Sequence, residues 1–296
     1  MHLSILLWGF TGVFGRAIAL TGVILVFYRL LLTVPILFLL GRWRGKIRLL
    51  PWVQWRPLVY IGFIITLHWV CFYGSIKASN ISVGLSCLST SAVFTAILEP
   101  ILNRSRFKLP ELLLALLSAF GMFLIFHFEK FYADGILLGL AAALLSSYFT
   151  ILNKKQSTRM DSLSLSFYEL ASGLGFISLA LPLYIWCTPG VRLVPSTGEW
   201  LLLGAFSIFC TVLPFNLSLI SLRKISAFTA NLSINLEPVY GMLLAFVFFK
   251  EQKELKLGFY LGSGMLLFSV VLYMLLKFRA FRNRQVATGE AALEKA

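Results

Sequence analysis

Long apolar runs, separated by short polar connections, dominate the pattern of hydrophobic and polar positions along this chain. A membrane-spanning helix needs about 17 to 25 mostly apolar residues, because only a helix satisfies its own backbone polar groups in hydrocarbon. The pattern therefore predicts an all-α integral membrane protein with ten transmembrane helices, near residues 3–20, 22–40, 57–77, 80–102, 109–128, 134–152, 164–187, 199–221, 226–249 and 257–277.

Composition supports a membrane location. Hydrophobic residues make up 59% of the 296 residues, charged residues make up 13%, and the mean hydropathy is +0.87. A soluble protein of this size could not bury so much apolar surface. The formal charge of +14 would also suit nucleic acid, but the basic residues lie in short clusters between apolar runs. We therefore expect the chain to lie in a lipid bilayer and not to bind nucleic acid.

The basic clusters indicate an orientation. Most of the 26 Lys and Arg residues fall in the connections near 41–56, 103–108, 153–159 and 223–224 or in the polar tail 279–296. Positive residues concentrate on the cytoplasmic side of membrane proteins, so both termini are expected in the cytoplasm. The four cysteines show neither CxxC spacing nor histidine partners, and we expect no disulfide, no metal site and no cofactor.

Several short sequences recur at a separation of 140 to 144 residues. "FYRL" at 27–30 returns as "FYEL" at 167–170, "ISVGLS" at 81 returns as "ISAFTA" at 225, and "SAFGMFLIF" at 118 returns as "LGSGMLLFS" at 261. The chain is therefore predicted to hold two repeats of five spans, 1–130 and 131–278, before its tail. An odd number of spans inverts the second repeat in the membrane, an arrangement typical of secondary transporters.

Specific stretches of the sequence are similar to a known family. They are "WGFTGVFGR" at 8–16, "FYRLLL" at 27–32, "FYGSIKASNIS" at 72–82 and "LEPVYGMLLAFVFFKEQ" at 236–252. Over residues 3–277 the chain resembles the EamA-like family of the drug/metabolite transporter superfamily. It departs from the family pattern at "FFKEQ", which keeps Glu251 but lacks a glycine, and in the fourth span, where Pro100 replaces the proline expected at Phe94.

The resemblance implies a secondary-active carrier in the bacterial inner membrane. Such carriers have two five-span repeats and usually export small metabolites, amino acids and drugs among them, by alternating access. The cargo differs widely among members, so the resemblance does not identify it. Coupling to a proton or another ion, and assembly as a homodimer, remain open.

Two charged residues occupy equivalent positions in the repeats, Arg29 in the second run and Glu169 in the seventh. A charge in the centre of a span costs about 2.5 to 3.5 kcal/mol, so it needs a partner, water or a function. We hypothesise that Arg29 and Glu169 meet at the central cavity and bind substrate with the adjacent Tyr168. Arg29 would grip a carboxylate, and Glu169 would bind an amino group or carry a proton. A purely structural ion pair is the alternative.

The third run contains a second candidate group in "LHWVCFYGSIK". Trp69, Tyr73 and Lys77 follow at i, i+4 and i+8 and therefore share one helical face, with His68 on its flank. Trp69 and Tyr73 are predicted to pack a planar or apolar part of the substrate, although helix packing would also explain them. His68 titrates near neutral pH and is a candidate for proton coupling, while Lys77 is expected to reach toward the outer surface.

The ninth run holds the stretch "NLSINLEPVYG". Pro238 should interrupt the helix here and free backbone carbonyls that bind an ion or a substrate. We assign Asn235 to substrate binding and Glu237 to proton or ion coupling. The alternative is a packing kink with asparagines that bond across helices.

Other classes of membrane protein fit the sequence less well. An intramembrane enzyme would need a nucleophile with a base, a metal set or paired aspartates, but the two aspartates, Asp134 and Asp161, lie outside the apolar runs or at their edge. A channel would need a recognisable filter or charged ring. A structural membrane protein would not require the duplicated charges. The sequence therefore favours a carrier that is not an enzyme.

The orientation is directly testable. Reporter domains fused after Arg48 and Arg284 should lie in the cytoplasm, and a reporter fused after Lys130 should lie outside, because the basic residues concentrate on one side. An external signal at Arg48 would reverse the proposed orientation.

Overall fold

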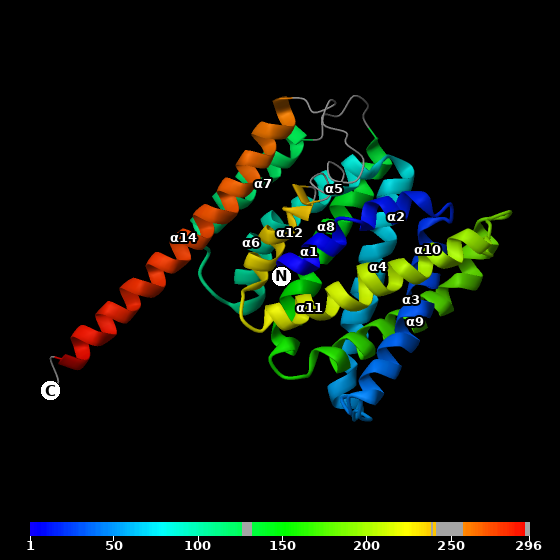
Figure 1. The fold of residues 1–296 in the computed structure, drawn as a ribbon, viewed down its shortest axis with the longest axis horizontal. Coiled ribbons are helices and arrows are strands. Elements are labelled where there is room, and N and C mark those ends of the chain that lie inside the picture. The colour runs from blue at the N-terminus through cyan, green and yellow to red at the C-terminus, as the bar shows by residue number, and fades with distance from the viewer. Residues whose placement is uncertain (126–131, 238, 241–256, 294–296) are drawn as a thin grey trace.

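The computed structural model describes residues 1–125, 132–237, 239–240 and 257–293, and these residues form a helical bundle without a strand (Figure 1). The predicted all-α class is therefore confirmed for the described part of the chain. The helices are α1 (His2–Trp8), α2 (Thr11–Ala17), α3 (Gly22–Trp43), α4 (Trp52–Ala78), α5 (Ile81–Ser89), α6 (Ser91–Asn103), α7 (Leu109–Ile125), α8 (Ala133–Ser157), α9 (Ser162–Cys187), α10 (Thr197–Ser207), the π-helix η1 (Ile208–Val212), α11 (Leu213–Leu222), α12 (Ala227–Ile234) and α14 (Leu257–Leu293).

Seven described helical segments are long and apolar enough to cross a membrane, and shorter apolar helices cover 2–15 and 109–124. The outer surface of the bundle carries large apolar side chains, such as Leu113, Phe120 and Leu179, which water would solvate poorly. Exposed tryptophans also mark helix ends, with Trp43 as the last residue of α3 and Trp186 near the end of α9. Tryptophan is enriched at membrane–water interfaces, so these features indicate an integral membrane protein.

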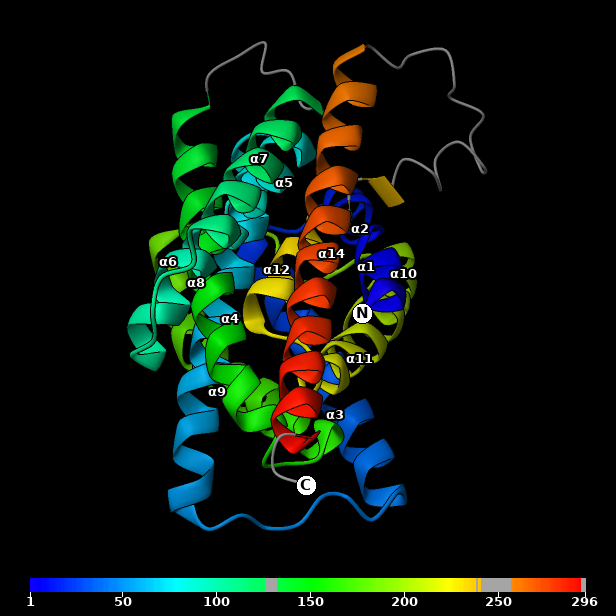
Figure 2. The same cartoon turned by 90° about the vertical axis from the view of Figure 1, so that its left-hand side faces the viewer.

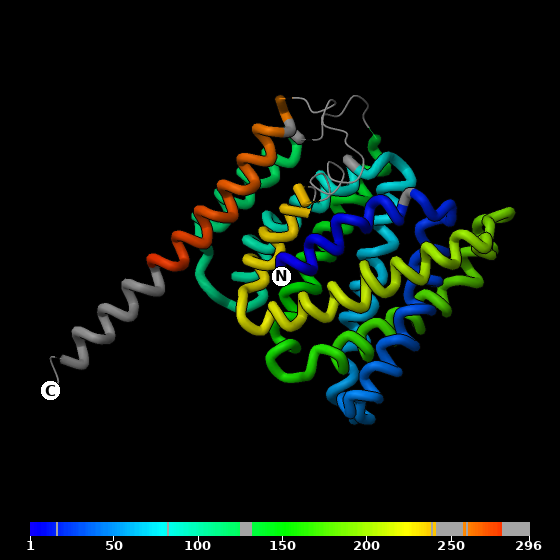
Figure 3. Tube along the Cα trace, in the orientation of Figure 1, coloured from blue at the N-terminus to red at the C-terminus, as the bar shows by residue number. Residues whose placement is uncertain are grey.

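Several predicted spans consist of more than one helix. The first contains α1 and α2, the fourth contains α5 and α6, and the eighth contains α10, η1 and α11, which follow one continuous path across the bundle (Figure 3). The end of the fifth predicted span, most of the ninth beyond α12, Pro238 and Glu251 lie outside the described residues. The count of ten spans, the inverted relation of the repeats and their boundaries stay predictions.

Connections that were assigned to one side of the membrane lie together at one end of the bundle. The Lys46 ammonium is 3.9 Å from the Asp161 carboxylate, and Ser164 Oγ donates to the Lys46 carbonyl at 2.6 Å. Arg223 Nη2 donates to the Met160 carbonyl at 2.7 Å. The connections after α3, α8 and α11 therefore share an end.

The connection between α2 and α3 is bound by side chains from two other helices. Lys77 of α4 donates to the Ile18 carbonyl at 2.7 Å, and Glu199 of α10 accepts from the Ala19 amide at 2.8 Å. Arg192 pairs with the same Glu199 carboxylate. Lys77 was expected to reach toward the outer surface, and it is exposed at the end of α4 while it donates to this connection.

Helix α4 lies at the centre of the bundle and packs against α3, α8 and α9, whereas α14 and α7 lie side by side at its edge (Figures 1 and 2). Helices α4 and α9 cross closely at Gly62 and Gly173. A Cβ atom on Gly62 would overlap the Glu169 carbonyl oxygen, and a Cβ atom on Gly173 would overlap Thr66 Oγ1. Glycine at these positions allows the two backbones to meet, as small residues do between membrane helices.

A methyl group added at this crossing should lower the stability of the protein. Gly62→Ala is expected to destabilise the protein by about 1 to 3 kcal/mol, because the Glu169 carbonyl cannot move away without shifting α9. Thermal unfolding of the purified protein in detergent measures the effect. Gly175→Ala, where a Cβ atom would meet nothing within 4 Å, is the matched control on α9. Equal stability of the two variants would contradict the close crossing.

Candidate functional site

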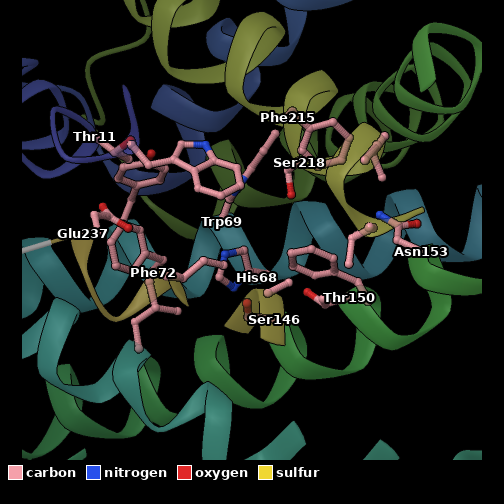
Figure 4. Close-up of a pocket in the computed structure, with 18 of the residues that line it drawn as sticks. Thr11, His68, Trp69, Phe72, Ser146, Thr150, Asn153, Phe215, Ser218 and Glu237 are labelled. Carbon is pink, nitrogen blue, oxygen red and sulfur yellow. The ribbon is translucent and has the colours of Figure 1, made fainter. Parts of the chain in front are cut away.

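A cavity opens among helices that come from both predicted repeats. Its atom-free volume, including the space at its mouth, is about 810 Å³, and α1, α2, α3, α4, α5, α8, α11 and α12 contribute to its wall. Its polar lining residues are Thr11, Arg29, His68, Ser146, Thr150, Asn153, Ser218 and Glu237, and its aromatic ones are Trp8, Trp69, Phe72, Tyr73, Phe149 and Phe215. Thr11 and Glu237 lie at one end and Asn153 at the other, with Trp69 and His68 between them (Figure 4).

Arg29 of α3 is the cationic residue in this lining, and its side chain is held by neutral groups. Its Nε donates to Thr211 Oγ1 at 2.7 Å, its Nη1 donates to Tyr73 Oη at 2.7 Å, and its Nη2 donates to the Cys210 carbonyl at 3.1 Å. The residue is only 2% exposed. These contacts fix the guanidinium at the cavity wall, between α4 and the π-helix.

Aromatic rings also pack against the same guanidinium. Its central carbon lies 3.9 Å from the centroid of Trp69 and 4.5 Å from that of Phe206. A desolvated cation–π contact contributes about 2 kcal/mol, and a hydrogen bond to a charged group about 1.5 to 3 kcal/mol. Together these contacts exceed the cost of about 2.5 to 3.5 kcal/mol for a charge within a span. Neutral groups can therefore stabilise Arg29 without an anion.

The backbone acceptor for Arg29 exists because a proline interrupts the helix. Pro214, in the first turn of α11, has no N–H and cannot bond to the carbonyl four residues earlier, which is that of Cys210. The chain widens into a π-helix over residues 208–212 immediately before it. The Cys210 carbonyl is thus left without its usual helical donor and accepts from Arg29 instead. The proline in "VLPFN" was a sequence signal for this site that the repeat pattern did not reveal.

The charge of Arg29 has no carboxylate partner within the described part of the chain. The ion pairs there are Lys46–Asp161, Lys108–Glu111 and Arg192–Glu199. Arginine has five N–H donors, and the three bonds to Thr211, Tyr73 and Cys210 leave two for another acceptor. The cavity therefore offers a positive charge with unused hydrogen-bond donors.

The predicted approach of Arg29 to Glu169 is wrong for this structure. Glu169 lies in α9, is fully buried, and its Oε2 accepts from Asn153 Nδ2 of α8 at 3.3 Å. It is not part of the cavity lining. Equivalent positions in two repeats do not guarantee that side chains converge, because each side chain follows the rotation of its own helix: Arg29 points toward η1, and Glu169 points toward α8.

Tyr168 also lies away from the cavity. Its hydroxyl group donates to the Arg48 carbonyl in the connection between α3 and α4, and its ring packs against Trp55. These contacts attach the first turns of α9 to that connection and to the first turn of α4. Substrate binding by Tyr168 is not supported by this position.

Trp69 and Tyr73 lie together on α4, as their helical spacing suggested, and both contact Arg29. Trp69 and Tyr73 line the cavity and contact the guanidinium, and Trp69 also packs edge-on against Phe215 of α11. His68 lines the cavity beside them, and its Nδ1 lies 2.8 Å from the Ala142 carbonyl. A carbonyl only accepts, so Nδ1 carries the proton and Nε2 of the neutral ring is an acceptor.

Glu237 and Asn235 follow the end of α12 at Ile234. Glu237 lines the cavity, is 6% exposed, and has no hydrogen-bond or ion-pair partner among the described residues. Asn235 lies in a smaller adjoining cavity, and its Nδ2 donates to the Ser89 carbonyl at 3.2 Å and to Ser118 Oγ at 2.8 Å. The predicted interruption at Pro238 lies outside the described residues.

The hydrogen bond from Arg29 to Thr211 can be tested without any substrate. Thr211→Val removes the hydroxyl acceptor at nearly constant volume and should destabilise the protein by about 1.5 to 3 kcal/mol, the value of a hydrogen bond to a charged group. Thermal unfolding in detergent measures the loss. Thr33→Val on α3 is the matched control, because the buried Thr33 Oγ1 has no partner, and this variant should be as stable as the parent or more so. A larger loss for Thr33→Val would contradict the assignment.

Comparisons with known proteins agree with this architecture. A solved structure described as "Crystal structure of protein" matches with a TM-score of 0.73 and 18% sequence identity, over 92% of this chain and 95% of that chain. At this identity the match supports the fold alone. The curated proteins give no significant match.

The sequence model of one family matches nearly the whole chain. It is the model of the EamA-like transporter family, and it matches residues 1–127 and 133–275. The match includes every described residue that lines the cavity. The chain therefore belongs to the EamA-like transporter family of the drug/metabolite transporter superfamily.

Proposed function

We propose that the protein is a secondary-active carrier that exports small metabolites, such as amino acids, from the cytoplasm across the bacterial inner membrane by alternating access. Both termini would face the cytoplasm. The observation that carries the proposal is the buried Arg29 guanidinium, which lines the cavity, has unused donors and has no carboxylate partner among the described residues.

The cargo group that best suits Arg29 is a carboxylate. A guanidinium binds two carboxylate oxygens through parallel N–H donors, which gives both affinity and orientation. Tyr73 and Thr211 already fix the guanidinium, so little side-chain freedom would be lost when the anion binds. Arg29 would therefore select an anionic or zwitterionic cargo.

Other lining residues suit the rest of an amino acid. The rings of Trp69, Phe72, Phe149 and Phe215 form an apolar wall for its side chain. Glu237 has no described partner and would accept hydrogen bonds from the ammonium group, and His68 Nε2 offers a further acceptor. The coupling role that the sequence suggested for Glu237 and His68 would make them bind a proton or ion instead.

The interrupted helices provide the parts that alternating access requires. Trp8 and Thr11 flank the break between α1 and α2, η1 binds Arg29, and Glu237 follows the end of α12. In secondary transporters, such discontinuous helices surround the substrate while the two repeats reorient around it. We propose that these three breaks are where the chain bends during export.

Family membership favours a carrier over the enzyme and the channel that the sequence left as alternatives. Among the described residues there is no cluster of three or more His, Cys, Asp or Glu side chains that could hold a metal ion. We propose no second function, because no contact of the described residues favours one.

Counterflow in proteoliposomes tests the function. Liposomes preloaded with one unlabelled amino acid receive the radiolabelled form outside, and phenylalanine, leucine, glutamate and lysine are compared. We expect exchange of phenylalanine and leucine above that of lysine, because Arg29 and the aromatic wall disfavour a cationic side chain. Protein-free liposomes are the control. Absence of exchange for every amino acid would contradict an amino-acid carrier.

The roles of two lining residues are tested in the same assay. Arg29→Gln should reduce exchange about 30-fold or more, because loss of a charge pair costs about 2 kcal/mol or more. Trp69→Ala should mainly raise the half-saturation concentration, since the ring contacts the bound cargo. Trp186→Ala, at an exposed end of α9, is the control for loss of an indole ring. A Trp69→Ala protein with unchanged half-saturation would remove Trp69 from the substrate site.

A further inference from the structure

Glu169 lies behind the cavity wall, one side chain away from the cavity itself. Its side chain is fully buried, and its Oε2 accepts from Asn153 Nδ2 at 3.3 Å. Asn153 is 1% exposed and lines the cavity at the end opposite Glu237 (Figure 4). The amide of Asn153 thus connects a buried carboxyl group to the space where cargo would bind.

Two oxygen atoms of this pair lack a donor. Glu169 Oε1 and Asn153 Oδ1 are both buried and make no hydrogen bond in the described structure. An ionised carboxylate has only acceptors and would remain buried with a single hydrogen bond, which is costly in a low-dielectric environment. A protonated carboxyl group brings its own O–H donor and loses the charge. The surroundings of Glu169 therefore favour the neutral acid.

No cationic side chain compensates Glu169 from the helices packed against α9. These helices are α3, α4, α8 and α11. Their buried or partly buried cationic and imidazole groups bind elsewhere. Arg29 binds Thr211, Tyr73 and Cys210, and His68 binds Ala142. Lys77 binds the Ile18 carbonyl, and Lys154 binds the carbonyls of Leu222 and Arg223. The described Arg42, Arg56 and Lys155 are exposed near helix ends. On the α4 side, the backbone of Glu169 meets Gly62.

We propose that Glu169 carries the proton that drives transport, and that Asn153 is the positioning residue that links this proton to the cavity. This inference rests on the proposed function and gives Glu169 a task distinct from binding cargo. In the described state the O–H bond of Glu169 is intact. When α8 and α9 separate, that bond breaks, the proton passes to a water molecule of the cavity to give hydronium, and a carboxylate remains. Reprotonation from the opposite side of the membrane completes one proton exchanged per cycle.

The protonation state can be measured without any cargo. Infrared spectroscopy of the purified protein at neutral pH should show a carbonyl band from a protonated carboxylic acid, and Glu169→Gln should remove one component of it. Asn153→Leu keeps the carboxyl group but removes its hydrogen-bond donor, so it should shift that component. Glu99→Gln is the matched control, because Glu99 lies away from the cavity and accepts from the Phe228 amide. A band that is unchanged in both Glu169→Gln and Asn153→Leu overturns the proposal.

Coupling is measured in proteoliposomes with radiolabelled phenylalanine. Glu169→Gln should lose accumulation driven by a pH gradient by about tenfold or more, yet should keep counterflow at equal pH, which needs no net proton movement. Accumulation that survives in Glu169→Gln overturns the proposal. Folded Glu169→Gln that loses counterflow as well also overturns it, because Glu169 would then bind cargo. If the parent protein shows no counterflow, the proposed function fails for this probe, and the infrared result still decides the state of Glu169.

Discussion

The position of Arg29 constrains most of the site. A guanidinium within a membrane protein must be surrounded by acceptors and aromatic faces, and these come from three different elements: Tyr73 and Trp69 from α4, Phe206 from α10, and Cys210 with Thr211 from η1. Arg29, Trp69 and Tyr73 belong to the first predicted repeat, whereas the other three residues belong to the second. One side chain therefore joins the two halves at the wall of the cavity.

In the proposed carrier, this arrangement would affect cargo binding and helix movement together. Because the partners of Arg29 are neutral, its charge is not cancelled and would attract the anionic cargo that we propose. The same partners lie on both sides of the predicted boundary between the repeats. In the proposed alternating access, reorientation of one repeat would therefore stretch or break some of these hydrogen bonds. A carboxylate bound to the two remaining N–H donors would change the strength of the hydrogen bonds from Arg29 to Tyr73, Thr211 and Cys210. Cargo binding and helix movement would then act on the same few contacts.

The sequence predicted some parts of this structure and missed others for identifiable reasons. Apolar run length gave the helical class, and the i, i+4 spacing placed Trp69 and Tyr73 on one face, where the structure shows them against Arg29. The pairing of Arg29 with Glu169 failed, because position in a repeat does not specify the direction of a side chain. Partners from distant segments, Thr211 and Asn153 among them, could not be inferred without tertiary packing.

Local sequence rules were more informative than the repeat at one position. A proline in an apolar run removes one N–H and so frees one carbonyl, which makes Pro214 a specific pointer to the Cys210 carbonyl and hence to a nearby donor. For the eighth apolar run, this rule predicts an irregular helix near Pro214. It does not predict that Arg29 donates to the freed carbonyl. The sequence shows which backbone carbonyl lacks a helical N–H donor, whereas the side chain that donates to this carbonyl depends on the fold.

Two acidic residues near the cavity, Glu237 and Glu169, have different surroundings. These surroundings determine which of them could contact a cargo and which could only hold a proton. Glu237 lines the open space beside Thr11, and Asn153 lies at the opposite end (Figure 4). Glu169 is not part of the lining and is hydrogen-bonded to Asn153. An acidic group in contact with the cavity can exchange hydrogen bonds with each incoming cargo. A carboxyl group behind the wall cannot contact the cargo in this state, but it can hold a proton away from cavity water until the helices around it separate. If Glu169 is the proton site, as we propose, its place behind the wall would avoid direct competition between proton and cargo. Proton release would then depend on the movement of α8 and α9.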